Sequence, residues 1–242
     1  MRIACFIGLI VVSPLRADDV KTLLSRAAAL HDAGKYAEAL QLVEEAIKAN
    51  SQNPAAFSLR GMLHFKLGNI RESLADFDEQ IRLDPKAKES HWRRGLTLYY
   101  AEKFADGAAQ FVLSDRAEPE DVENAIWHFL CNARVVGIDK ARSDLLKVSQ
   151  DPRGDLMMAI YRLFRGEEKP QDILTLAETN NVTPQERHVQ RFYAHYYVGM
   201  YYEAVGDKEK SLAHIQKAVE KYPVKHYMMD VAKVHLKLRK GK

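Results

Sequence analysis

The sequence repeats one pattern, a helical hairpin, with a period of 34 residues. Apolar residues between positions 70 and 81 are spaced by four, three and four, which is typical of one face of an amphipathic helix. Gly68 precedes this helix, and Gly34 precedes the related segment KYAEAL 34 residues earlier. Because glycine adopts the left-handed conformation that ends a helix, each glycine predicts a turn between two antiparallel helices. Such a hairpin cannot bury its apolar face alone, so stacked copies are expected.

Four copies of the hairpin share this spacing, at residues 20–53, 54–87, 88–121 and 192–225. Small side chains recur at the eighth and twentieth places of each copy, where they let two helices approach closely. Proline at the thirty-second place ends the second helix of three copies. The small residues are Ala27, Gly61, Gly95 and Gly199 at the eighth place and Ala39, Ser73, Gly107 and Ser211 at the twentieth, and the prolines are Pro85, Pro119 and Pro223.

The middle and the end of the chain carry weaker versions of the pattern. Residues 122–155 and 156–191 are predicted to be degenerate hairpins, the second of them divided by Gly166 and Pro170. Residues 226–238 are predicted to be a final capping helix, because a stacked array needs an end cap with a polar outer face.

The period and the small and aromatic places resemble the tetratricopeptide repeat. The resemblance implies an all-α fold, namely a tetratricopeptide-repeat helical-hairpin superhelix (α-solenoid) with a C-terminal capping helix. Since no linker rich in glycine, proline or serine interrupts residues 18–242, we expect a single domain. In such arrays the first helices line a concave groove, so the expected partner is a protein or peptide.

Seven residues fall at places that line this groove in the resembled family. Aromatic and arginine side chains suit a protein-binding surface, and Trp92 is the best single anchor. The alternative is that some of these side chains pack between repeats or against the cap. Chaperone-binding members hold a peptide carboxylate with five polar residues, of which only Arg93 is matched here, so that mode is not expected. The predicted groove residues are Phe65, Trp92, Leu96, Tyr99, Tyr100, Arg134 and Tyr196.

Residues 1–17 have the form of a secretory signal peptide. Arg2 is followed by an apolar run over residues 3–12, and Ala17 precedes the predicted cleavage point. The run is too short to cross a bilayer, which takes roughly 20 apolar residues. We therefore predict an exported chain in the periplasm or cell envelope, with no integral membrane segment after signal removal. The alternative is a hydrophobic leader on a cytosolic protein.

The charge of the chain does not point to nucleic acid. Without Arg2 and Arg16 the formal net charge of +3 becomes +1, so no general attraction to polyanions is expected. One basic cluster lies in the C-terminal tail. We interpret it as a solvated helix end whose cations suit the helix dipole, with contact to an anionic surface as the alternative. The cluster consists of Lys233, Lys237, Arg239, Lys240 and Lys242.

No residue pattern indicates catalysis, a metal or a cofactor. His128 and Cys131 are three apart on one helix face, but catalytic dyads usually come from separate elements, and no oxyanion loop is visible. His188 and His195 lack a third ligand at a suitable spacing. We therefore predict a protein that is not an enzyme and has no cofactor. The alternatives are a helical enzyme with an unrecognised site and a structural self-assembly module.

The overall layout is similar to that of the NlpI-type lipoproteins of the bacterial envelope. The similarity is clearest at residues 123–134 and 195–219, within a layout of three early repeats, an irregular middle and a later repeat with a cap. It implies a non-enzymatic adaptor, often a homodimer, that docks envelope proteases and peptidoglycan enzymes. A lipoprotein needs a cysteine just after its apolar run, whereas Cys5 follows only MRIA. The sequence therefore argues against a lipid anchor.

Overall fold

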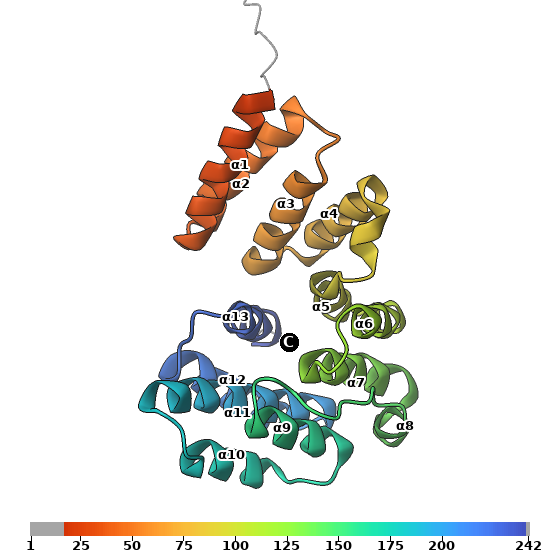
Figure 1. The fold of residues 1–242 in the computed structure, drawn as a ribbon, viewed down its shortest axis with the longest axis vertical. Helices are drawn as coiled ribbons and strands as arrows, with labels where there is room; N and C mark the ends of the chain where they lie inside the picture. Colours follow the sequence, from red (N-terminus) through yellow and green to blue (C-terminus); the bar gives the residue numbers. More distant parts are fainter. Residues whose placement is uncertain (1–16, 241–242) are drawn as a thin grey trace, which may run out of the picture.

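The computed structural model describes residues 17–240, and every regular element in that range is helical. The helices follow one another as antiparallel hairpins joined by short turns (Figure 1). They are α1 (Ala17–Asp32), α2 (Tyr36–Ala49), α3 (Pro54–Leu67), α4 (Ile70–Leu83), the 3-10 helix η1 (Pro85–Lys88), α5 (Trp92–Tyr100), α6 (Phe104–Ala117), α7 (Val122–Val136), α8 (Ile138–Ser143), α9 (Asp155–Arg165), α10 (Pro170–Thr179), α11 (Pro184–Ala204), α12 (Lys208–Lys221) and α13 (Tyr227–Arg239).

The α3–α4 hairpin shows why the repeated residues produce this shape. Gly68 ends α3 in the left-handed conformation, with φ of 79°. Within the hairpin, a Cβ atom added at Gly61 would lie 2.7 Å from the ring of Phe77. The small residue therefore lets α3 and α4 approach closely, and α4 stops at Leu83, two residues before Pro85.

The middle of the chain departs from the regular pattern. Helix α8 has six residues, and an irregular segment over residues 144–154 follows it. Gly166 caps α9 in the left-handed conformation, and Pro170 begins α10. Helix α11 begins at Pro184, eight residues before the start of the copy at 192–225, because Thr183 and Glu186 form a capping box there. It is 21 residues long and packs against α7, α9, α10 and α12.

The C-terminal helix α13 turns back into the array. It packs against α12, its predecessor in the chain, and also against α3 from the second hairpin. In Figure 1 it lies in the middle of the molecule, with α3 and α5 on one side and α11 and α12 on the other. Its side chains are buried on nearly all sides, and they are Met228, Met229, Val231, Ala232, Val234, His235 and Leu236. A helix with this burial is part of the core.

The apolar interior is divided unevenly. One large cluster runs from α3 to α13, whereas α1, α2 and part of α3 share two small clusters. Among residues 17–240, no helix is long and apolar enough to cross a membrane. The predicted signal peptide lies almost wholly outside the described residues, and α1 begins at Ala17.

Candidate functional site

Helix α13 occupies the concave side of the array, where a groove was predicted. The ring of Tyr227, at the start of α13, stacks on Phe65 and stands edge-on to Trp92, with centroids 6.1 and 5.0 Å apart. One turn further on, Asp230 Oδ2 forms an ion pair with Lys66 Nζ at 2.9 Å, and the Lys66 side chain is only 7% exposed. The chain therefore fills much of its own concave face.

Five of the seven predicted groove residues are buried in this arrangement. Phe65, Leu96 and Tyr196 are 0% exposed, Tyr99 is 1% and Tyr100 is 7% exposed. Their contacts are with their own chain, so in this conformation they form the interior beneath α13. These positions agree with the alternative given above, in which the side chains pack between repeats or against the cap. A role for them in partner binding stays a prediction.

The tyrosine pair also fixes α13 through its hydroxyl groups. Tyr100 Oη lies 3.2 Å from His235 Nδ1. Tyr99 Oη donates to Glu203 Oε1, which also accepts from Arg239 Nε at 3.1 Å. Burial raises the pKa of both tyrosine hydroxyls, so they act as neutral donors. Arg134, another predicted groove residue, is 39% exposed and lies 3.8 Å from Glu203 at the rim of this network.

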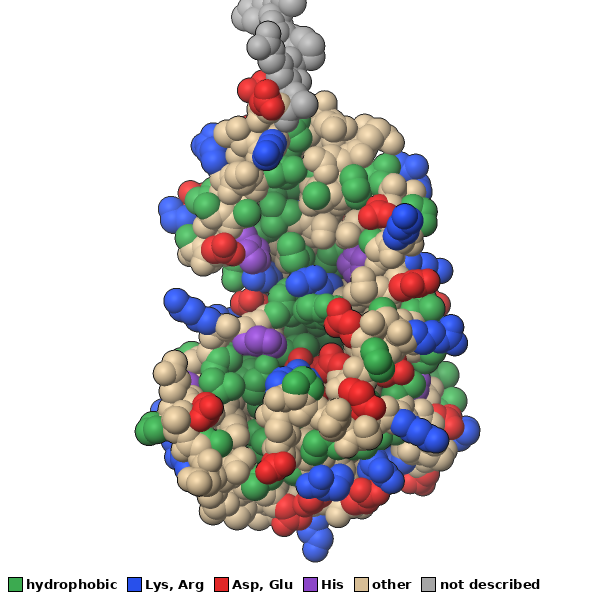
Figure 2. All heavy atoms as spheres, viewed as in Figure 1, with side chains coloured by type: hydrophobic (Ala, Val, Ile, Leu, Met, Phe, Trp, Pro, Cys, Tyr) green, Lys and Arg blue, Asp and Glu red, His purple; other side chains and the backbone are tan. Residues whose placement is uncertain are grey.

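Two predicted groove residues, Trp92 and Leu96, line an open cleft, and of the two Trp92 is the partly exposed one. The cleft has a volume of about 410 Å³ and lies where the first turns of α5, α7 and α13 meet. Figure 2 shows a hollow on this face, floored by hydrophobic side chains and bordered by side chains of both charges. Its walls include Trp92, Arg93, Asn124, Trp127, Lys225 and Tyr227.

Helix caps hold these walls in place. The imidazole of His91 accepts a hydrogen bond from the Arg94 amide and begins α5 at Trp92. Asp121 caps α7 by accepting from the Glu123 amide, and His226 caps α13 by accepting from the Met228 amide. Three helix N-termini therefore converge on one cleft, and the α12–α13 connection supplies part of its rim.

The acidic residues of the cleft are already paired. Arg153 donates to Glu123 Oε2 at 2.6 Å and to Asp121 Oδ1 at 2.5 Å. The other Glu123 oxygen accepts a hydrogen bond from Tyr197. Burial raises the pKa of the Glu123 carboxyl, while Arg153 opposes that rise. These carboxylates hold the wall of the cleft together.

Arg93 has no such partner. Its guanidinium lies over the ring of Trp92 at 4.3 Å and near that of Tyr227 at 5.3 Å. Among residues 17–240 it forms no ion pair, and its Nε is buried without a hydrogen-bond partner. Sequence reasoning had considered Arg93 only as one member of the chaperone-type set. The stacking on Tyr227 could not be foreseen, because it depends on where α13 docks.

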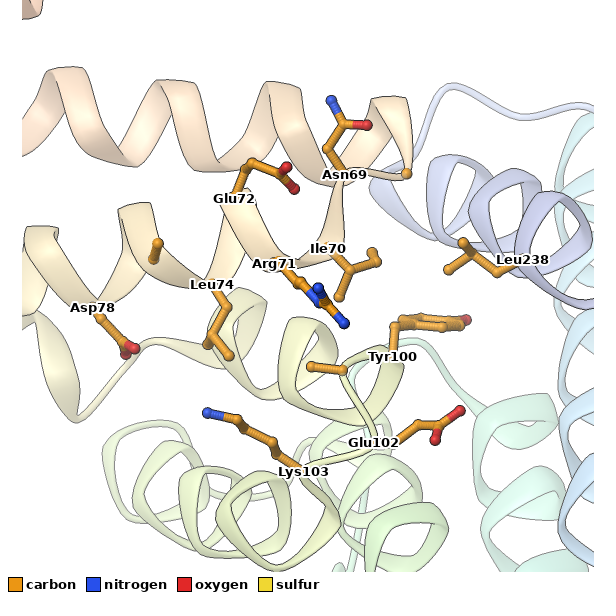
Figure 3. A pocket seen from close by; sticks show the side chains of 13 residues that line it. Asn69, Ile70, Arg71, Glu72, Leu74, Asp78, Tyr100, Glu102, Lys103 and Leu238 are labelled. Carbon is orange, nitrogen blue, oxygen red and sulfur yellow. The ribbon is translucent and has the colours of Figure 1, made fainter.

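A second hollow lies at the edge of the array, beside α4 and the α5–α6 turn. It has a volume of about 850 Å³ and opens broadly to solvent. Figure 3 shows Arg71, Glu72, Asp78 and Lys103 around it, with Tyr100 and Leu238 at one end. Its exposed charges of both signs mark it as a surface depression between hairpins, with no convergent set of polar groups.

The histidine and cysteine candidates occupy structural positions. Cys131 is fully buried, and burial raises the pKa of its thiol, which opposes formation of a nucleophilic thiolate. His188 lies 3.0 Å from the carbonyl oxygen of Pro223, and His195 lies 3.0 Å from His214. Within residues 17–240, no group of three or more His, Cys, Asp or Glu side chains is arranged to hold a metal ion.

Two cations of the C-terminal cluster serve the docking of α13. Lys237 donates to the carbonyl oxygen of Leu67 at 2.6 Å, at the C-terminal end of α3. Arg239 pairs with Glu203. Arg239 is 8% exposed, so the predicted solvated position is wrong for this residue. Both contacts place a positive charge where a helix end or a carboxylate needs one, which gives these two cations a structural role.

The comparisons with known proteins agree with the repeated hairpins. The model of the tetratricopeptide repeat matches residues 24–88 and 58–121. A curated relative, Hsp70-Hsp90 organizing protein 2 of Arabidopsis thaliana, is 29% identical over 145 residues, which are 58% of this chain and 23% of the relative. This chain therefore spans less than a quarter of that protein.

Solved structures share the fold at low sequence identity. A tetratricopeptide repeat protein from Parabacteroides merdae aligns with a TM-score of 0.56 and 18% identity, over 94% of this chain and 87% of that one. MamA from Desulfovibrio magneticus RS-1 aligns with a TM-score of 0.52 and 16% identity, over 85% and 96%. PilW, a type IV pilus biogenesis factor, gives 0.50 and 13%, over 90% and 99%. Residues 24–121 thus carry tetratricopeptide repeats, and the predicted all-α superhelix with a C-terminal helix is confirmed as the fold.

Proposed function

We propose that this protein is a non-enzymatic scaffold of the cell envelope, exported by its leader, that binds partner proteins through the cleft beside Trp92. Tetratricopeptide repeats generally mediate contacts between proteins, and residues 24–121 carry them. Two similar proteins, an organizing protein and a pilus biogenesis factor, also favour an assembly role. Docking of envelope proteases or peptidoglycan enzymes, as the NlpI-type resemblance implies, belongs to this proposal.

One observation carries the choice of site. Trp92 is half-buried in a cleft of about 410 Å³ whose other walls include Trp127 and Tyr227. Partly exposed aromatic rings in a concave site are typical anchors for a protein partner, because they bury a large area at low entropic cost. The five buried groove residues act in this picture as the support beneath the cleft.

The test is the substitution Trp92→Ala, examined with Tyr202→Ala as a matched control. Tyr202 is also a half-buried aromatic residue, but it lies on α11 and contacts His214. A partner captured from envelope extract is purified, and its affinity for each variant is measured together with the thermal midpoint. We expect Trp92→Ala to lower the affinity at least about 30-fold and Tyr202→Ala to leave it unchanged. Unchanged affinity in a folded Trp92→Ala variant would contradict the proposed site.

Export and self-association are tested separately. The intact mass of protein isolated from its native source should correspond to a chain that begins at Asp18. Retention of residues 1–17 would contradict export, and an added diacylglycerol would contradict the absence of a lipid anchor. Sedimentation velocity decides whether a homodimer forms. Turnover of a small molecule by the pure protein would favour the enzyme alternative instead.

A further inference from the structure

The chemistry of the cleft suggests what kind of group its partner presents. Arg93 is a partly buried guanidinium that lies against two aromatic rings and pairs with no carboxylate among residues 17–240. The aromatic rings contact the flat face of the guanidinium, whereas its N–H groups point outward in the plane of the guanidinium itself. An arginine held in this way is pre-oriented to donate paired hydrogen bonds to a planar anion.

The side chain of Asn124 is a second, independent feature of the same cleft. The residue is 4% exposed and lines the cleft, and its amide forms no hydrogen bond with any described residue. Nearby, the Trp127 indole N–H is buried without an acceptor. Buried polar groups of a folded protein are normally paired. The Trp127 N–H is closed off from solvent, whereas Asn124 lines the cleft, so its amide is available to a ligand that brings hydrogen-bond acceptors.

The electrostatics of the cleft favour a negative ligand. Arg153 pairs with Asp121, Glu123 and also Asp151. On the other side of the cleft, Arg93 and the exposed Lys225 have no acidic partner in the described chain. The N-terminal turns of α5, α7 and α13 add their positive partial charges. The charged groups of the cleft that remain without a partner of opposite sign are therefore the two cations Arg93 and Lys225.

We propose that the cleft is a carboxylate-binding subsite that takes an acidic residue lying next to an aromatic one in a partner peptide. The carboxylate accepts hydrogen bonds from Arg93, with Asn124 and Lys225 beside it, and the aromatic ring packs against Trp92 and Tyr227. This site differs from the five-residue set of the chaperone-binding members, because Tyr227 of the docked α13 forms one of its walls. A carboxylate fits better than a doubly charged phosphate, since Asp121 and Glu123 border the cleft.

This inference rests on the proposed scaffold function and names the partner chemistry of the same site. The chain has two tryptophans, Trp92 and Trp127, and both line the cleft. Intrinsic fluorescence therefore reports on ligands that enter it, and calorimetry gives the affinity. Three probes are compared: Ac-Ala-Glu-Phe-Ala-NH2, its neutral counterpart Ac-Ala-Gln-Phe-Ala-NH2, and Ac-Ala-Gln-Phe with a free C-terminal carboxylate.

The glutamate probe should bind about tenfold or more tightly than the neutral one, because a charge-assisted bidentate contact is lost in the neutral probe. Preference for the third probe alone would mean that the cleft takes a chain terminus, and would contradict the proposed acidic side chain. The preference should weaken as salt is raised. Equal affinities for charged and neutral probes, or no binding of any probe, would overturn the carboxylate subsite.

Variants of Arg93 complete the test. Arg93→Gln should abolish the preference for the acidic probe, and Arg93→Lys should keep only part of it, since lysine cannot donate in bidentate geometry. Arg71→Gln removes an exposed arginine from the edge hollow of Figure 3 and should change nothing. A preference that persists in folded Arg93→Gln protein would refute the inference. If Trp92→Ala still abolishes binding of the purified partner in that case, the scaffold function stands without the carboxylate subsite.

Discussion

Tyr227, the first residue of α13, stacks on Phe65 of α3 with ring centroids 6.1 Å apart and ring planes 22° apart. The contact joins the last helix of the chain to the second hairpin. Because the same ring stands edge-on to Trp92 of α5, one side chain connects the C-terminal helix to two successive hairpins. The position of α13 therefore depends on aromatic contacts that lie far apart in the sequence.

The substitution Tyr227→Ala should destabilise the fold by about 2–3 kcal/mol, somewhat less than the loss of a fully buried aromatic side chain, because the ring is partly exposed. The thermal midpoint should fall by several degrees in a chain of this size. The thermal midpoint of Phe57→Ala, which removes an aromatic ring from α3 away from α13, is measured for comparison with that of Tyr227→Ala. A midpoint for Tyr227→Ala equal to that of the native protein would show that α13 does not depend on this contact.

Adding a methyl group at Gly61 should destabilise the fold about as much as removing the ring of Tyr227. An added Cβ would lie 2.7 Å from Phe77, a distance that forces α3 and α4 apart. We expect Gly61→Ala to cost about 1–3 kcal/mol in the free energy of unfolding, measured with urea. Ser58→Ala on the same helix is the control. The double variant with Phe77→Leu should recover part of the loss, and additive costs would contradict a steric cause.

The hairpins could be predicted from the sequence because their determinants are local. A glycine such as Gly68 ends one helix, a proline such as Pro85 follows the end of the next, and a small residue between them sets the helix distance. Each signal acts within one 34-residue copy. The irregular middle kept enough of these signals for Gly166 to mark the end of α9 and Pro170 the start of α10.

The candidate site was less accessible to prediction, because it depends on contacts between distant segments. The family pattern placed Phe65 and Tyr100 in an open groove, but α13 covers them. Nothing in residues 226–238 alone shows that this helix folds back toward α3. Asn124 was overlooked because a polar residue in an apolar helix stands out only when its amide is found unpaired. Trp92 was named from spacing, and its role in binding stays a prediction.

Acid should weaken the fold through its buried histidines. Burial lowers the pKa of His235 to about 3 and that of His91 and His195 to about 4, from an ordinary value of 6.5. Below pH 6.5 the unfolded chain takes up protons at these sites and the folded chain does not, so stability falls as pH drops from 6.5 toward 4. Each histidine should contribute about 1–2 kcal/mol of loss by pH 5.

Urea denaturation at pH 7 and pH 5 checks this prediction, with His235→Gln as the informative variant. His235 is fully buried, and Tyr100 and Arg239 of its surroundings do not titrate in this range. The variant is expected to be less stable at pH 7, because it leaves Tyr100 with a poorer partner, but to lose less stability on acidification. A pH dependence as steep as that of the native chain would exclude His235 as a contributor.

Cys131 is expected to act as a packing residue with no role in function. A Cβ atom added at Gly107 would lie 2.7 Å from the Cys131 sulfur, so the thiol fills the space between α6 and α7. Cys131→Ala should therefore cost about 1–2 kcal/mol of stability through a smaller packed volume, while partner binding is kept.

In the native chain, burial raises the pKa of the thiol, so maleimide should label it slowly. A cysteine introduced by the exposed substitution Ser51→Cys should react at once, as mass mapping of the labelled sites would show. Loss of partner binding in a folded Cys131→Ala variant, or rapid labelling of Cys131, would show that this thiol does more than fill space.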